Sequence, residues 1–156
     1  MSLTPEEMAR LDEFLRPTMI ALVATVGAGG MPQLTPNWYT FIGGKLAVST
    51  TKERFKYRNL VRDPRLSVCV LSEPLAASYV TITGTAEIMD DDSIWPITQS
   101  IVERYVRPDG VEARMRNLRR QNRVPWRAQR LQCRRGLRDY QLALYTGTDH
   151  FAGRLE

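Results

Sequence analysis

The sequence is poor in the residues that most often carry nucleophilic catalysis and metal binding. It has two cysteines, Cys69 and Cys133, and one histidine, His150. Two cysteines are too few for a disulfide scaffold, and we expect Cys69, in an apolar run, to be a buried small hydrophobic residue. The single histidine argues against histidine-based metal sites and Ser-His triads. The acidic run 90–92 precedes a predicted helix, and N-capping explains it without a metal.

Long apolar runs are absent too. None approaches the roughly 20 residues that a transmembrane helix needs, and the N-terminal MSLTPEEMARLDEF is acidic and amphipathic, unlike a signal or transit peptide. We therefore expect a cytoplasmic protein with no membrane partner. With 156 residues, of which 43% are hydrophobic and 25% charged, the chain has the composition of one soluble domain.

The net charge of +5 is unevenly distributed. Many arginines and few acidic residues lie between Arg107 and Arg138, whereas the first half of the chain is nearly balanced. A basic segment can bind nucleic acid, but aromatic residues are sparse here and no DNA- or RNA-binding motif is recognised. We expect no nucleic-acid partner.

Alternating hydrophobicity and glycine-rich turns predict a mainly β chain with flanking helices. Gly27 to Gly30 and Gly43-Gly44 mark hairpin turns. Pro32 and Pro36 cannot donate to a ladder, so their strand should be irregular or at an edge. Up to six β segments joined mostly by hairpins indicate a small antiparallel barrel. The expected strands cover residues 19–26, 31–42, 45–49, 65–71 and 79–89, with a short one at 142–145, and the expected helices cover 4–16, 90–104 and a segment from 108.

The most informative stretch covers residues 46–63, where a strand over 46–49 is followed by a predicted helix. Three hydroxyls at the switch are good helix N-caps, and basic residues follow them before Asp63-Pro64 ends the helix. Unpaired N–H groups, the helix dipole and fixed cations together predict an anion site, most naturally for a phosphate. The alternative is an ordinary solvated basic helix face. The residues concerned are Ser49, Thr50, Thr51, Lys52, Arg54, Lys56 and Arg58.

Three runs of the sequence carry a family resemblance. VATVGAGGMPQLTPNW, LAVSTTKERFKYRNLVRDPRLSVCVL and YVTITGTAEI together resemble the pyridoxamine 5′-phosphate oxidase-like FMN-binding split-barrel superfamily, and most closely its deazaflavin (F420)-dependent reductase branch. The resemblance covers roughly residues 5 to 122. It implies a six-stranded antiparallel split β-barrel, a homodimer, and cofactor sites at the dimer interface.

Residues 123–156 depart from the family pattern. Relatives usually close the barrel with a final alternating strand, and we find none after Asn122, because arginines interrupt the sequence from Val124 onward. We therefore expect a split-barrel domain over 1–122 and an atypical segment over 123–156, either part of the same domain or poorly ordered. A diverged tail and an altered reading frame both explain such a sequence.

The resemblance also implies a function and a set of binding residues. It implies that bound F420 passes a hydride to a small electron-poor organic acceptor; the alternatives are an FMN-dependent flavoprotein and a non-catalytic carrier of F420 or FMN. Because the cofactor carries the chemistry, we expect no catalytic residue and no metal ligand in the protein. The phosphate would be held by Ser49, Thr50, Thr51, Arg54 and Lys56, with Asn59 supporting the loop. The resemblance also implies that Gln33, Thr35, Pro36 and Trp38 border the ring system. Independently, their segment mixes amide, hydroxyl and aromatic groups, against which a flat ligand could lie.

Overall fold

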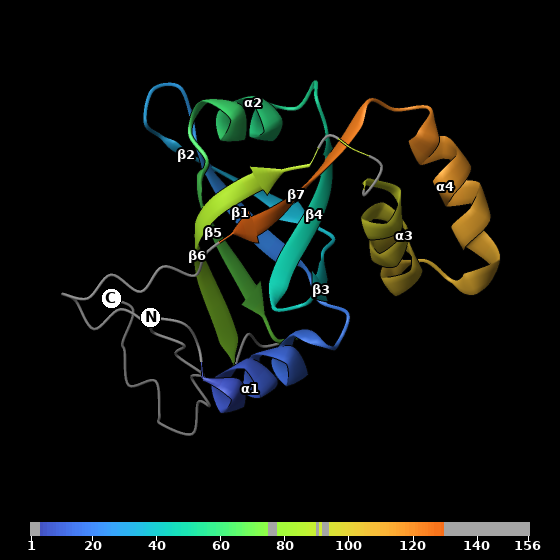
Figure 1. The fold of residues 1–156 in the computed structure, drawn as a ribbon, viewed down its shortest axis with the longest axis horizontal. Helices are drawn as coiled ribbons and strands as arrows, with labels where there is room; N and C mark the ends of the chain where they lie inside the picture. The colour runs from blue at the N-terminus through green and yellow to red at the C-terminus, as the bar shows by residue number, and fades with distance from the viewer. Residues whose placement is uncertain (1–3, 75–77, 90, 92–93, 130–156) are drawn as a thin grey trace, which may run out of the picture.

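The computed structural model describes residues 4–74, 78–89, 91 and 94–129. Within them, seven antiparallel strands form one sheet in the order β2-β1-β5-β6-β7-β4-β3, curled into a half-barrel with helices around it (Figure 1). The mainly β split-barrel fold is thus confirmed, with seven strands in place of six. The strands are β1 (Ala21–Val26), β2 (Pro32–Asn37), β3 (Thr40–Ile42), β4 (Lys45–Thr51), β5 (Arg65–Leu71), β6 (Tyr79–Ile88) and β7 (Arg123–Gln129).

The strand predicted over 31–42 is in fact two strands, at opposite edges of the sheet. β2 pairs with β1, and β3 pairs with β4. The chain crosses between them through Trp38 and Tyr39, and the Tyr39 ring is fully buried while its hydroxyl donates to the Leu15 carbonyl. The prediction that the two prolines place their strand at an edge is confirmed for β2, and the prediction of one continuous strand is wrong.

A closing strand is present after Asn122, contrary to the prediction. β7 fills the gap between β4 and β6, with Trp126 opposite both Val48 and Ile88. Trp126 is 1% exposed, and Arg127 on the same strand forms a 2.5 Å ion pair with Glu87 of β6. Arg127, which lies in the described part of this arginine-rich segment, therefore has a partner on a neighbouring strand. Residues 130–156, with Cys133, His150 and the strand predicted at 142–145, lie outside the described part of the chain.

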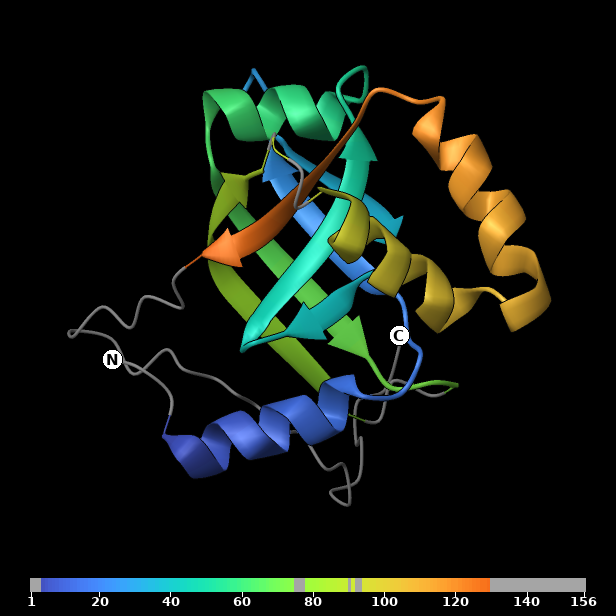
Figure 2. The same cartoon turned by 45° about the vertical axis from the view of Figure 1, so that its right-hand side comes forward.

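Helices cover the ends and one side of the sheet (Figures 1 and 2). The first helix has the predicted start, with Thr4 and Glu7 in a reciprocal capping box. No helix in the described ranges is both long and apolar enough to cross a membrane. The helices are α1 (Pro5–Leu15), α2 (Phe55–Arg62), α3 (Ile94–Tyr105), the short 3-10 helix η1 (Pro108–Gly110) and α4 (Val111–Arg119).

Two apolar clusters hold these elements together. The main core joins buried faces of the strands to Leu11 and Leu15 of α1, while Val102, Met115 and Leu118 form a second cluster that joins α3 to α4. Cys69 is half-exposed, so the prediction that it is buried is wrong. The second cluster matters for function because it fixes α4 on α3, beside the sheet.

Candidate functional site

The three hydroxyls predicted as helix caps lie inside strand β4. Pairing with β7 keeps Ser49, Thr50 and Thr51 extended, and α2 starts only at Phe55, after an N-cap residue, Arg54, whose side chain makes no capping hydrogen bond. The capping prediction is therefore wrong, because it overlooked the partner strand. The hydroxyls of the first two residues nevertheless face a pocket.

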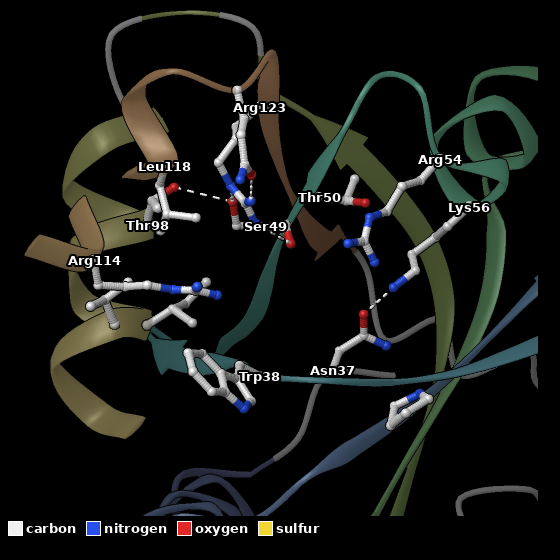
Figure 3. A pocket seen from close by; sticks show the side chains of 14 residues that line it. Asn37, Trp38, Ser49, Thr50, Arg54, Lys56, Thr98, Arg114, Leu118 and Arg123 are labelled. Atoms are coloured by element: carbon white, nitrogen blue, oxygen red, sulfur yellow. Dashed lines mark hydrogen bonds between the residues drawn. The ribbon is translucent and has the colours of Figure 1, made fainter. Parts of the chain in front are cut away.

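This basic pocket has a volume of about 410 Å³ and lies between β4, the start of α2, the start of β7 and the α3–α4 pair (Figure 3). Side chains from both sides converge on it, and α3 and α4 supply an apolar wall that includes Ile101, Val102 and Leu118. Six of the predicted binding residues line it: Pro36, Trp38, Ser49, Thr50, Arg54 and Lys56.

Four cations line the basic pocket, and no acidic residue is among the residues that line it. Arg54 and Arg114 are exposed at its rim, Arg123 is half-buried, and Lys56 is only 5% exposed. Burial, and next the charges of Arg114 and Arg54, lower the pKa of Arg123 to about 10. Lys56 and Arg123 are therefore partly desolvated and repelled by neighbouring arginines, and a bound anion would relieve both effects.

Lys56 is the most buried of the four cations. Burial, followed by the charge of Arg54, lowers the pKa of its amine to about 8. The amine donates a hydrogen bond to the side-chain oxygen of Asn37, a neutral partner that leaves the charge uncompensated. Asn37 itself is held by donating to the Thr35 carbonyl, at 2.6 Å.

Hydroxyl groups complete the polar side of the basic pocket. Ser49 Oγ lies 3.2 Å from Thr98 Oγ1 and accepts from Arg123 Nε at 3.1 Å. Thr50 Oγ1 is buried and has no hydrogen-bond partner. A buried hydroxyl without a partner is costly, and Thr50 lines the basic pocket, so a ligand group that reached this atom would relieve the cost.

An aromatic side chain bounds the basic pocket opposite these hydroxyls. Trp38 is 37% exposed and stacks on Tyr105 of α3, with ring centroids 5.0 Å apart and planes at 3°. The guanidinium carbon of Arg114 lies 5.5 Å from the centroid of the Trp38 ring. The pocket thus combines cations and hydroxyls with an aromatic surface, as a flat ligand bearing an anionic group requires.

The remaining predicted residues do not line the basic pocket. Asn59 donates to Thr25 Oγ1 at 3.1 Å and to Gln33 Oε1 at 3.0 Å, and its own oxygen accepts from Arg62. Thr35 Oγ1 accepts from Asn37. Gln33 and Asn59 therefore tie α2 to β1 and β2 behind the pocket, while Thr51 ends β4 outside it.

The structure also adds residues that sequence reasoning missed. Arg123 and Arg114 enter the basic pocket from β7 and α4, more than fifty residues after the predicted phosphate segment. Nothing local distinguishes them from the other arginines around them. Asn37 could have been predicted from the sequence, because it lies in the same polar and aromatic segment as Pro36 and Trp38.

Inorganic phosphate should bind the basic pocket more weakly as pH rises above about 8. An anion prefers Lys56 protonated, so the group's pKa in the complex is higher than its value of about 8 in the free protein. Between these two pKa values, the affinity should fall by up to tenfold per pH unit. Titration calorimetry from pH 7 to 9.5 measures this effect. The Lys56→Arg variant should show little change over the same range, and a constant affinity in the wild type would contradict the assignment.

Comparisons with known proteins agree with the resemblance found in the sequence. In solved structures, a conserved hypothetical protein of Mycobacterium tuberculosis is 27% identical, with a TM-score of 0.67 and 83% of each chain covered. A protein named F420 reductase is 24% identical, with a TM-score of 0.60 over 76% of this chain and 90% of its own. The heme storage protein HutZ of Vibrio cholerae is 20% identical, with a TM-score of 0.62 over 85% of this chain and 93% of its own. A family model described as pyridoxamine 5′-phosphate oxidase matches residues 8–125, and this chain therefore belongs to that family.

Proposed function

We propose that this chain is an oxidoreductase that binds deazaflavin F420 and serves hydride transfer to a small electron-poor organic acceptor. The observation that carries the proposal is the basic pocket, where four cations meet an aromatic side chain and no acidic residue is among those that line it. A solved structure of similar fold is named an F420 reductase, and the RFKYRN segment supports the same cofactor.

The residues present fit the phosphate of such a cofactor. Arg54, Lys56 and Arg123 would neutralise its charge, and Thr50 Oγ1, which lacks a partner, would donate a hydrogen bond to it. Trp38 would border the ring system. When bound, F420 supplies the hydride, while the side chains of the pocket position the cofactor and exclude water.

F420 is preferred to FMN because of its tail. F420 carries an oligoglutamate chain beyond the phosphate, which needs additional cations, and Arg114 is exposed at the rim of the basic pocket. FMN has the same phosphate without this tail, so an FMN-dependent flavoprotein is the second candidate.

Parallel titration of the purified apoprotein with F420, FMN and heme tests the proposal. We expect micromolar or tighter binding of F420, weaker binding of FMN, and oxidation of reduced F420 in a screen of conjugated alkenes and quinones. Preferential binding of FMN would favour the second candidate. Binding without turnover would indicate a carrier, and preference for heme over both would contradict the proposal.

We further propose that two copies of the chain form a homodimer with the cofactor between them. Large apolar side chains are exposed on and near the edge strands, among them Met31 at 76%, Leu34 at 62% and Ile42 at 55%. Exposed apolar surface of this kind is often covered by a partner. Light scattering after size exclusion should give twice the chain mass of 17.8 kDa. A monomer at micromolar concentration would contradict this part of the proposal.

A further inference from the structure

The Lys56 amine has an unusual combination of burial and access. The side chain is 5% exposed, yet it lines the basic pocket, and Figure 3 shows its amine directed toward Asn37 at the edge of that space. No ion pair within the described ranges gives it a carboxylate partner. A lysine amine in this position can meet a ligand in the pocket while being shielded from bulk water.

The same surroundings make the amine nucleophilic. Arg54, Arg114 and Arg123 are the charged groups that share the pocket with it, and burial together with Arg54 lowers the Lys56 pKa to about 8. At pH 8 the neutral, reactive form is therefore roughly a hundred times more abundant than for an ordinary lysine. Desolvated lysines of this kind are the ones that form Schiff bases with carbonyl compounds.

We propose that Lys56 is a covalent capture site for small aldehydes that carry a phosphate group. The phosphate would lie on Arg54 and Arg123, beside the unpartnered Thr50 hydroxyl. The aldehyde would then face the amine, and Trp38 would favour an aldehyde with a flat ring. Phosphate anchoring and amine reactivity together select this class over simple aldehydes.

The reaction balances without an oxidant or reductant. The neutral Lys56 amine adds to the aldehyde carbon, the carbonyl oxygen gains protons, and water leaves to give an imine. Hydrolysis reverses the reaction and restores the lysine. The capture site depends on the anion site of the proposed function and not on its redox chemistry, and an imine-bound aldehyde would compete with the cofactor for the basic pocket.

Trapping experiments on the apoprotein test this inference. Pyridoxal 5′-phosphate serves as the phosphorylated aldehyde and pyridoxal as the matched control without phosphate, each followed by borohydride reduction and peptide mapping. The other lysines of the chain are Lys45 and Lys52, so peptide mapping can quantify the reduced adduct at each lysine separately. We expect the adduct at Lys56 to exceed that at either other lysine at least tenfold, to form at least tenfold faster with the phosphorylated aldehyde, and to be suppressed by inorganic phosphate.

Two outcomes would overturn the inference: equal labelling of the three lysines, or equal rates with pyridoxal and its phosphate. The Lys56→Arg variant keeps the positive charge but cannot form an imine, so its residual labelling measures the background. If this variant fails to fold, the comparison of adducts at the three lysines of the wild-type protein still tests the inference. Cofactor titration is a separate measurement: binding of F420 without a Lys56 adduct would refute the capture site alone, and an adduct without cofactor binding would refute the proposed function alone.

Discussion

The Arg54→Ala, Lys56→Ala double variant is expected to bind F420 at least about a hundredfold more weakly than the wild type. Both side chains line the basic pocket, and each charge-assisted contact to a phosphate contributes about 1.5–3 kcal/mol. Arg54 is exposed, so we take the lower end of that range for the pair, about 3 kcal/mol in total. Fluorescence titration of the apoprotein with F420 gives the two dissociation constants.

A matched control separates local contacts from the loss of net charge. The Arg16→Ala, Arg107→Ala double variant also removes two positive charges, but these side chains are 73% and 91% exposed, pair with Asp12 and Asp109, and do not line the basic pocket. Its affinity for F420 should stay within about threefold of the wild type at physiological salt, because screening weakens distant charges. Equal losses in both double variants would mean that long-range attraction, and not the pocket, holds the cofactor.

Replacing Trp126 with alanine should reduce the free energy of unfolding by about 3–5 kcal/mol, as is typical for a large buried aromatic residue. Trp126 is 1% exposed and belongs to the main core. It lies on β7, between Val48 and Ile88 of the two neighbouring strands, so its loss leaves a cavity where the sheet closes. Urea denaturation followed by circular dichroism measures the change.

Phe55→Ala is the control for this experiment. Phe55 is 66% exposed, and its ring contacts the guanidinium of Arg58 at 4.4 Å, so its removal should cost no more than about 1 kcal/mol. A loss below about 1 kcal/mol for Trp126→Ala as well would mean that β7 does not close the sheet. The position of Arg123 in the basic pocket would then be unsupported too.

The elements that the sequence predicted well are those specified by local patterns. Gly43 and Gly44 have positive φ values of 58° and 74°, which glycine adopts easily, and they make the turn between β3 and β4. β6 follows from ten residues of alternating pattern, and α1 follows from its capping box. In each case the information lies within a few neighbouring residues.

The elements that the sequence missed depend on contacts distant in the chain. β7 shows strand alternation at Val124 and Trp126, but its two arginines break the apolar pattern. Their place in a strand is explained by partners elsewhere in the chain: Arg123 donates to Ser49 and Arg127 to Glu87. The division of 31–42 into two strands depends on burial of Tyr39 against α1 and α3. Neither partner can be identified from the local sequence.

The predicted anion site remains a prediction, and the structure changes the reasoning behind it. Arg54 and Lys56 lie together as expected, but no helix cap contributes to the site. The hydroxyls face the basic pocket from a strand, and two arginines from the second half of the chain complete it. Gln33 was expected to border the ring system and Asn59 to support the phosphate loop. In the structure Asn59 donates to Gln33 in a part-buried network, and neither residue lines the basic pocket.

A crystal structure of the protein with bound F420 tests the central claim most directly. We predict that the cofactor phosphate lies within hydrogen-bonding distance of Arg54, Lys56 and Arg123, with the ring system beside Trp38. A phosphate bound elsewhere on the molecule, with Arg54 and Lys56 directed into solvent, would contradict the account.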